Sequence, residues 1–561
     1  MFVKKSWDTT AKNPKISHSI VESYRDPETN TPRHRTILNI SCLPPETIKA
    51  IELSLKDDSR LVDSEEISLS TGDALRGAGT LAIYRLWQKE NMEKVLKALT
   101  PAQRESVMVM VMQRILKPGS KNAIKEDFAD SIFKRRFSKK RFDENELYKI
   151  MDLLFHNYYD IQKRLRESND SSNTLLLYDI TSTYFEGQKA EGGEYGYSRD
   201  HRQDRCQIII GLVCNEKGLP LSVEVWPGNT ADKTTVKEQV KKLKETFGIE
   251  EAIIVGDKGM YSKANINKIL DEGLNYILST DWRLQKDQLL SRTPKQLSLL
   301  DDVGILEWED EGTRFIGCSS KWRKRREMKR RIQGIKTVKK ELKKLKKTTA
   351  KGSYYTWNSL FKKIENLLES AGVKDLWNIT IKPLDPDKSP DEKGKFELDF
   401  SLDKKALKDR KKREGKFVLE TSVDKDDKNA EEIKEAFMKQ PQIERAFRNI
   451  KSFLKIRPVF HWKERRIKAH VLICFLAFYL TKKAEIKLRE NGINREAVEV
   501  IRNWEKLRLT EITLDTGKDK LNEWQWQMGK TGTRVKDEIS DVGWWRSIQG
   551  YKRSILSDLD K

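Results

Sequence analysis

Two short segments near the start of the chain have the residue pattern of β-strands. They are residues 16–24 and 33–41, and the aspartate, asparagine and proline residues between them favour a turn. The sequence therefore predicts a small β-hairpin within an N-terminal region of residues 1–70.

The spacing of apolar residues changes to the helical period from residue 72 to about residue 165. Thr100 is followed by a proline, which is typical of an N-cap and the first position of a helix. We expect a helical DNA-binding domain over residues 71–170. Its basic clusters at 134–136 and 139–141 suit either a DNA contact or an ordinary solvated helix surface.

Short apolar runs then alternate with turns and a helical segment. The runs cover residues 174–179, 206–213, 221–225 and 252–257, with a helical pattern over 232–247 before the last run. The order strand, strand, strand, helix, strand predicts an α/β domain with a mixed sheet across residues 171–280.

A long basic helix is predicted inside the less regular region 281–428, after two short strands. Residues 321–351 hold sixteen Lys or Arg against two Glu, and apolar residues recur there at intervals of three and four. The apolar stripe is most simply explained by packing against another element, and the charged face is compatible with binding a row of DNA phosphates. Helical patterns return over 430–489, within a region 429–490, and a tryptophan-rich C-terminal region covers 491–561.

The charge balance indicates a polyanionic partner. The 561 residues include 109 Lys and Arg against 86 Asp and Glu, so the formal net charge is +23 and the pI is near 9.4. Hydrophobic residues make up 37% of the chain, which excludes disorder throughout. A strongly basic folded chain is typical of proteins that bind DNA or RNA.

Targeting signals and cysteine usage indicate a cytosolic protein. The N-terminus is charged where a secretory signal is apolar, and no run reaches the roughly 18 to 20 apolar residues of a membrane span. The 5 cysteines form no CxxC pair and no metal-binding group with the 6 histidines. We expect a reduced compartment, no membrane partner and no structural zinc.

Asp179 and Asp257 each end an apolar run of the α/β region. On adjacent strands, two such carboxylates at the edge of the sheet would share a divalent cation, and Mg²⁺ prefers carboxylate oxygens together with water and phosphate. An Asp at a strand end is also a common turn former or helix cap, so neither residue is decisive alone.

Glu444 is the best candidate for a third acid. A helix starting near residue 430 presents Glu444, Arg448 and Lys451 at intervals of four and three on one face. One acid and two cations on one face suit a metal site beside a DNA phosphate. Because the same spacing occurs on ordinary helices, the prediction depends on the three acids together.

Most of the chain resembles the DDE transposases of bacterial insertion sequences, in the subgroup with a β-rich insertion between the second Asp and the Glu. The stretches that carry the resemblance are YDITSTYFEG (178–187), YGYSRDHRQD (195–204), GLPLSVEVWPGNTAD (218–232), IIVGDKGMYS (253–262) and the segment 443–480, which begins IERAFRNIKSFLK. The resemblance extends back to the hairpin segment, residues 21–39.

The resemblance implies an α/β fold in which a ribonuclease-H-like catalytic core is split by a large insertion. The core would comprise residues 171–280 and 429–490, with the helical domain before it. It also implies two Mg²⁺ ions per active site, for which Mn²⁺ substitutes. The partners implied are double-stranded DNA, as terminal inverted repeats and as target, and a second copy of the chain in the synaptic complex. The expected location is the bacterial cytosol, at the nucleoid.

The three acids of the family fall on Asp179, Asp257 and Glu444, and its following Lys falls on Lys451. Phe437 and Gln440 replace a Tyr and an Arg of the family pattern, which is a departure at its accessory phosphate contacts. We also expect DNA contacts from the cations Arg448, His201, Arg465 and Arg466, although simple exposure explains a loop histidine and a solvated turn explains the last two.

These observations predict a DNA transposase, an enzyme of metal-dependent phosphoryl transfer on DNA. One alternative is a domesticated DNA-binding protein that has lost activity, and another is a Mg²⁺-dependent structure-specific nuclease that cuts without joining. Loss of an acid would favour the inactive binder, and all three acids are present.

Overall fold

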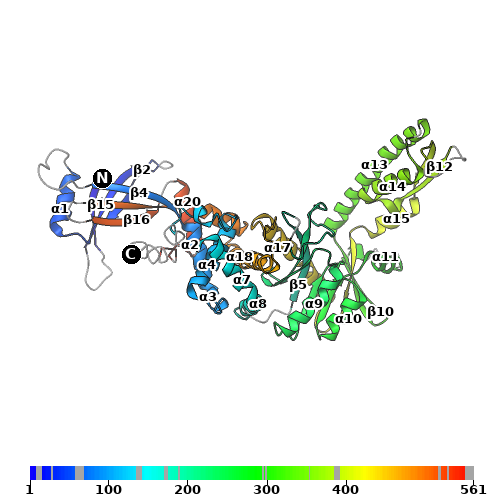
Figure 1. Ribbon diagram of the computed structural model, residues 1–561, viewed down its shortest axis with the longest axis horizontal. Helices are drawn as coiled ribbons and strands as arrows, with labels where there is room; N and C mark the ends of the chain where they lie inside the picture. The colour runs from blue at the N-terminus through cyan, green and yellow to red at the C-terminus, as the bar shows by residue number, and fades with distance from the viewer. Residues whose placement is uncertain are drawn as a thin grey trace.

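The computed structural model shows an elongated molecule (Figure 1). Strands from both ends of the chain lie at one end, helices occupy the middle, and a large sheet with a projecting helical arm lies at the other end. The structure describes the chain except residues 8–15, 27–29, 57–67, 134–141, 170–174, 188–189, 293–295, 297–299, 303, 353, 385–391, 516–519, 527–529, 547 and 550–561. The predicted basic clusters at 134–136 and 139–141 therefore lie outside the described residues.

An antiparallel three-stranded sheet forms the N-terminal region. It consists of β1 (Phe2–Trp7), β2 (Ile16–Arg25) and β3 (Pro32–Asn39), and α1 (Pro45–Ser54) packs against it. The predicted hairpin is confirmed as β2 and β3, with β1 as an additional strand.

The C-terminal region returns to pair with the segment after α1. β15 (Arg508–Asp515) lies between β4 (Ser68–Arg76) and β16 (Lys520–Trp526) in an antiparallel sheet. The prediction of helix from residue 72 onward is therefore wrong for residues 72–76, which belong to β4. Local periodicity carries no information on a strand partner that lies near the opposite end of the chain.

Helices of the middle region pack around the long helix α18 (Glu464–Glu490), and the helical pattern predicted up to about residue 165 is confirmed in the described residues from Ala78 onward. They are α2 (Ala78–Lys89), α3 (Met92–Val95), α4 (Pro101–Leu116), α5 (Ile124–Asp127), α7 (Glu144–His156) and α8 (Tyr158–Glu167), with α19 (Ala497–Trp504) and α20 (Lys530–Asp541) from the C-terminal region. The Thr100 hydroxyl caps α4 by accepting a hydrogen bond from the Gln103 backbone N–H. Within the described part of the chain, no helix combines the length and the apolar character needed to cross a membrane.

An eight-stranded mixed sheet has the order β10-β11-β14-β9-β8-β5-β6-β7. The parallel strands β5 (Leu175–Tyr184), β8 (Ile253–Gly256) and β9 (Asn275–Ser279) lie at its centre, and β6 (Gln207–Asn215) and β7 (Pro220–Pro227) continue it antiparallel. α9 (Asp232–Glu245) and α10 (Lys263–Asp271) share a core with one face, whereas the other face joins the helical core around α18. The predicted mixed sheet is confirmed.

The predicted insertion, residues 281–428, divides into two parts. After α11 (Trp282–Leu290), the strands β10 (Ile305–Asp310), β11 (Thr313–Ser319) and β14 (Lys416–Thr421) extend the main sheet. The remainder projects as an arm with its own core (Figure 1), built from α13 (Lys321–Lys351), α14 (Trp357–Ser370), η2 (Lys374–Leu376), β12 (Trp377–Pro383), β13 (Phe396–Leu402) and α15 (Lys404–Arg413).

The basic helix is confirmed as α13, but its apolar stripe packs along only part of its length. Val338, Leu342 and Leu345 are buried in the core of the arm, whereas Met328 and Ile332 are exposed. The arm supplies packing partners only to the later turns of the helix.

The helical region predicted over 430–489 consists of separate helices. α16 (Ala430–Met438) ends before α17 (Pro441–Ser452), and α18 comes after a further loop. The prediction that Glu444 lies on a helix starting near residue 430 is wrong, because Pro441 begins a new helix. Proline has no N–H to donate to a preceding turn, and it suits the first helical position.

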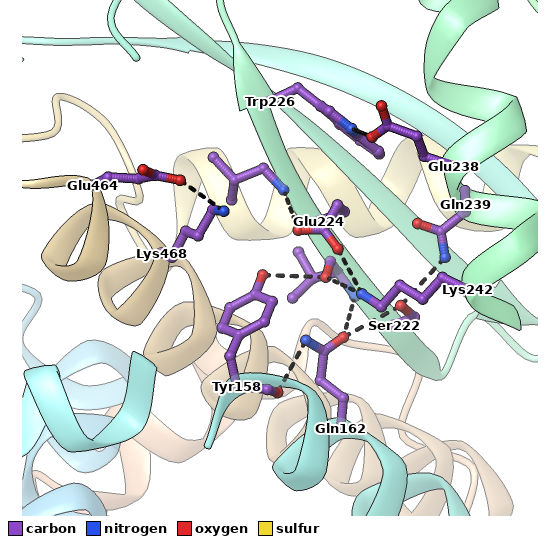
Figure 2. A network of polar contacts seen from close by, with 12 residues as sticks. Tyr158, Gln162, Ser222, Glu224, Trp226, Glu238, Gln239, Lys242, Glu464 and Lys468 are labelled. Atoms are coloured by element: carbon purple, nitrogen blue, oxygen red, sulfur yellow. Dashed lines mark hydrogen bonds and ion pairs between the residues drawn. The ribbon is translucent and has the colours of Figure 1, made fainter. Parts of the chain in front are cut away.

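A buried polar network connects α8, β7 and α9, close to the start of α18 (Figure 2). Lys242 Nζ donates hydrogen bonds of 2.8 Å to Glu224 Oε2 and 3.2 Å to the carbonyl oxygen of Val223. Gln162 accepts a 2.8 Å bond from the Val223 N–H, and the Tyr158 hydroxyl donates to the Val223 carbonyl. These contacts tie the edge strand β7 to helices on both sides.

Candidate active site

Asp179 lies within β5 rather than at its end. β5 continues to Tyr184 because β6 pairs with it as far as Gln207. The prediction that Asp179 ends its strand is therefore wrong, although the residue lies in the predicted sheet. The backbone N–H of Ile180 donates a hydrogen bond of 2.8 Å to Asp179 Oδ1.

Asp257 directly follows the last residue of β8, as predicted. β5 and β8 are parallel neighbours in which Leu177 pairs with Val255. Continued by two residues, this register places Asp257 opposite Asp179, so both acids lie at the same level of the sheet. The backbone N–H of Gly259 donates a hydrogen bond of 2.8 Å to Asp257 Oδ1.

Glu444 lies in the first turn of α17, which packs against β5 and β6. α17 is amphipathic and buries the apolar residues Ile443, Ala446, Phe447 and Ile450. Glu444 and Arg448 are exposed on the same helix. Because the buried face orients α17, it also determines which of its charged side chains stay accessible.

The pKa of Asp179 shows that the three carboxylates lie in one electrostatic environment. Burial and the negative charge of Asp257 raise this pKa from its ordinary value to about 7. The charge of Glu444 acts in the same direction, whereas the Ile180 N–H and the charge of Arg199 oppose the shift. Asp179 therefore holds a proton part of the time at neutral pH.

The donor chemistry fits a divalent cation, but the acids do not form a closed cage. Among the described residues, no group of three or more His, Cys, Asp or Glu side chains is placed to hold a metal ion. Carboxylate oxygens are the donors that Mg²⁺ prefers, and a cation would relieve the repulsion that raises the pKa of Asp179.

A comparison with protein families identifies the chain. A family model described as "Transposase DDE domain" matches residues 170–480, which is more than half of the 561 residues. The chain belongs to the DDE transposases. A second model, "IS1634 family transposase, N-terminal domain", matches residues 4–66 and places the chain with the transposases of bacterial insertion sequences.

Two solved transposase structures have low similarity to this transposase. A piggyBac transposase synaptic complex with hairpin DNA has a TM-score of 0.32 and 10% identity, over 76% of each chain. A Mos1 transposase paired-end complex has a TM-score of 0.15 and 12% identity, over 42% of this chain and 67% of the other. No curated protein matches the sequence.

The predicted cations near the transposase acids differ in accessibility. Arg448 is exposed on α17, one turn after Glu444. Lys451 is largely buried, and its Nζ lies 2.7 Å from Asp200 Oδ1 in the loop between β5 and β6. His201 is exposed in the same loop, where its backbone has a positive φ of 57°.

Arg465 and Arg466 bind a different part of the transposase. Both lie at the start of α18 and donate to Asp152 Oδ1 of α7, at 2.9 Å and 3.4 Å. Arg466 also lies over the ring of Tyr148, 4.4 Å from its centroid. These contacts join α18 to α7, and a DNA contact by either arginine stays a prediction.

The two positions that depart from the family pattern are used for packing. Phe437 contacts Phe417 of β14, with ring centroids 5.7 Å apart. Gln440 is buried immediately before α17. Neither residue supplies an exposed cation to the site.

The sequence alone did not indicate a role for Arg199 or Asp200. They lie in YGYSRDHRQD, where charges of both signs are typical of an exposed polar loop. Only 3% of the Asp200 side chain is exposed, because Lys451 and Arg457 cover it. No local sequence signal predicts this burial.

Proposed function

We propose that this transposase binds the terminal inverted repeats of an insertion sequence and catalyses metal-dependent DNA cleavage and strand transfer. The observation that carries the proposal is the parallel register of β5 and β8, which aligns Asp179 with Asp257. α17 packs on β5 and brings the charge of Glu444 into the same environment. These three acids are the proposed catalytic and metal-binding residues.

We infer a ribonuclease-H-like core from the strand order. β7, β6 and β5 form an antiparallel meander, and β8 and β9 follow in parallel beside β5. This five-stranded unit corresponds to the proposed catalytic core, and α17 supplies its last acid after the insertion. β14, β11 and β10 continue the sheet beyond it.

Asp179, Asp257 and Glu444 would hold two Mg²⁺ ions, with Mn²⁺ as a substitute. When bound, the metal activates the attacking water or 3′-hydroxyl and stabilises the leaving 3′ oxygen. The β5–β8 sheet holds the first two carboxylates in fixed register, and α17 presents the third. Asp179 would lose its proton on metal binding, because burial and repulsion raise its pKa and a cation would offset both.

Cations around the acids would hold the DNA backbone. Arg448 is exposed one turn after Glu444 and is the best placed of them, and His201 is exposed in the neighbouring loop. Pairing of two transposon ends implies a homodimer at synapsis, acting on DNA in the bacterial cytosol.

A cleavage and joining assay on a duplex that carries the element's own end tests this function. We expect nicking at the element boundary and joining of the 3′ end to target DNA, both dependent on Mg²⁺ or Mn²⁺ and abolished by EDTA. Cutting without joining would support a structure-specific nuclease instead. Binding without cutting, at every metal concentration, would support a domesticated DNA-binding protein.

The metal requirement should depend on pH. A proton on Asp179 competes with the metal, and its pKa in the metal-free protein is about 7. We expect the Mg²⁺ concentration for half-maximal cleavage to rise as pH falls below this value, by up to about tenfold per pH unit for one competing proton. Metal titrations between pH 5.5 and 8.5 measure this shift, and a requirement that stays constant across the range would contradict it.

We also propose that the exposed lysines of α13 contact DNA phosphates. Lys339 and Lys343 lie one turn apart on its exposed face. Replacing both with Gln should weaken DNA binding and reduce the slope of log K against log salt by up to about 2, at about 0.9 per phosphate contact. The matched control replaces Lys237 and Lys241, which are exposed on α9. Fluorescence anisotropy between 50 and 300 mM salt gives both slopes, and equal slopes would contradict the assignment.

A further inference from the structure

An ion-pair cluster joins the loop between β5 and β6 to the helix that carries Glu444. Asp200 in this loop accepts a hydrogen bond of 2.7 Å at Oδ1 from Lys451 Nζ, near the end of α17. Arg457, which follows α17, binds the same oxygen. The Asp200 carboxylate therefore binds one cation within α17 and a second cation just after this helix ends.

The loop is also attached to β5 close to Asp179. The backbone N–H of Arg199 donates a hydrogen bond of 2.9 Å to Ser182 Oγ of β5. The positive charge of Arg199 acts on the pKa of Asp179 and on the pKa of Lys451, and it lowers both. The segment around Arg199 therefore lies near both the first acid and the end of α17.

Burial makes this cluster a specific connection rather than a surface ion pair. The side chains of Asp200 and Lys451 are 3% and 11% exposed, and Asp200 Oδ2 is buried with no hydrogen-bond partner among the described residues. Burial lowers the pKa of Lys451, and the hydrogen bond to Asp200 opposes this change. Removing the carboxylate would leave the largely buried ammonium group of Lys451 without compensation, which strongly disfavours the present arrangement.

We propose that Asp200 is a positioning residue that clamps the C-terminal end of α17 to the β5–β6 loop and thereby holds Glu444 in place relative to Asp179. It acts through Lys451 and Arg457 and touches neither the metal nor the DNA. The inference rests on the proposed function, because that function assigns Glu444 to the metal site.

The test compares Asp200→Asn with Asp204→Asn in the full-length chain. Asp204 lies in the same loop and pairs with Arg202, but its side chain is 62% exposed. In a chymotryptic digest without DNA, cleavage after the exposed loop residues Tyr195 and Tyr197 should become several-fold faster in Asp200→Asn and stay unchanged in Asp204→Asn. In single-turnover DNA cleavage with Mn²⁺, only Asp200→Asn should slow the reaction, by roughly 10- to 100-fold, as expected for a misplaced catalytic group.

Two further measurements separate positioning from DNA binding and from general loss of structure. The Kd for DNA should not rise in Asp200→Asn, because a negative charge is removed, and Asp200→Glu should recover part of the cleavage rate. The double variant Asp200→Asn with Lys451→Met should cleave no more slowly than Asp200→Asn alone, because the two residues act as one unit.

Three results would overturn the clamp. The first is equal digestion rates for Asp200→Asn and Asp204→Asn, and the second is additive losses of cleavage rate in the double variant. The third is weaker DNA binding by Lys451→Met with the slope of log K against log salt reduced by about 1, which marks a direct phosphate contact. The digest needs no catalysis, so it can refute the clamp in a chain that cleaves no DNA. A wild-type chain that cleaves no DNA but digests as expected refutes only the proposed function.

Discussion

Replacing any one of the three acids should abolish DNA cleavage and strand transfer while DNA binding is retained. In Asp179→Asn, Asp257→Asn and Glu444→Gln the shape of the side chain changes little, but one proposed metal ligand loses its charge. A metal ion contributes several kcal/mol to the stability of the transition state, and about 1.4 kcal/mol corresponds to a factor of ten in rate. We therefore expect rates to fall by about 10³-fold or more.

Single-turnover nicking and joining, each measured with Mg²⁺ and with Mn²⁺, gives the rates, and anisotropy gives the Kd. Asp271→Asn is the matched control, because Asp271 is an exposed acid on α10. Binding should be unchanged or tighter in the three variants, since each removes a negative charge near the phosphates. Normal cleavage by Glu444→Gln would show that α17 does not carry the third acid, while loss in all three together with loss of binding would indicate misfolding.

Replacing Lys242 with Met should cause the largest loss of stability. The side chains of Lys242 and Glu224 are 9% and 10% exposed, and the ammonium group also bonds to the Val223 carbonyl (Figure 2). Removing one partner of a buried pair leaves an uncompensated charge and typically costs about 3–5 kcal/mol. The free energy of unfolding should therefore fall by about that amount.

Lys241→Met is the control on the same helix. Lys241 pairs with Glu245 at 3.7 Å, and both side chains are about 60% exposed, at 60% and 62%. An exposed pair contributes about 0–1 kcal/mol, so this variant should unfold almost as the wild type does. Urea unfolding followed by tryptophan fluorescence compares the two, and Lys242→Met with Glu224→Leu should regain part of the loss. Equal urea midpoints for Lys242→Met and Lys241→Met would show that the buried Lys242–Glu224 pair contributes no more to stability than the exposed pair.

The elements that could be predicted from sequence are those whose burial leaves a local pattern of apolar residues. α13 was found because its apolar residues recur at intervals of three and four. The strands β6 to β9 were found as short continuous apolar runs, because both faces of the sheet are buried there. Residues 72–76 were assigned wrongly because β4 exists through β15, far along the chain. The extent of β5 beyond Asp179 was missed for the same reason, since its partner β6 determines where the strand ends.

The sequence by itself determined which side chains are available for chemistry: two acids after apolar runs, a Glu with Arg and Lys on one helix, and a strong excess of positive charge. The tertiary structure alone decided how they are used. The β5–β8 register aligned Asp179 with Asp257 and, with burial, raised the pKa of Asp179 to about 7. The fold also enclosed Asp200 between Lys451 and Arg457. The physical reason is that desolvation and charge interactions depend on groups that are close in space, and these groups come from segments that are distant in the chain.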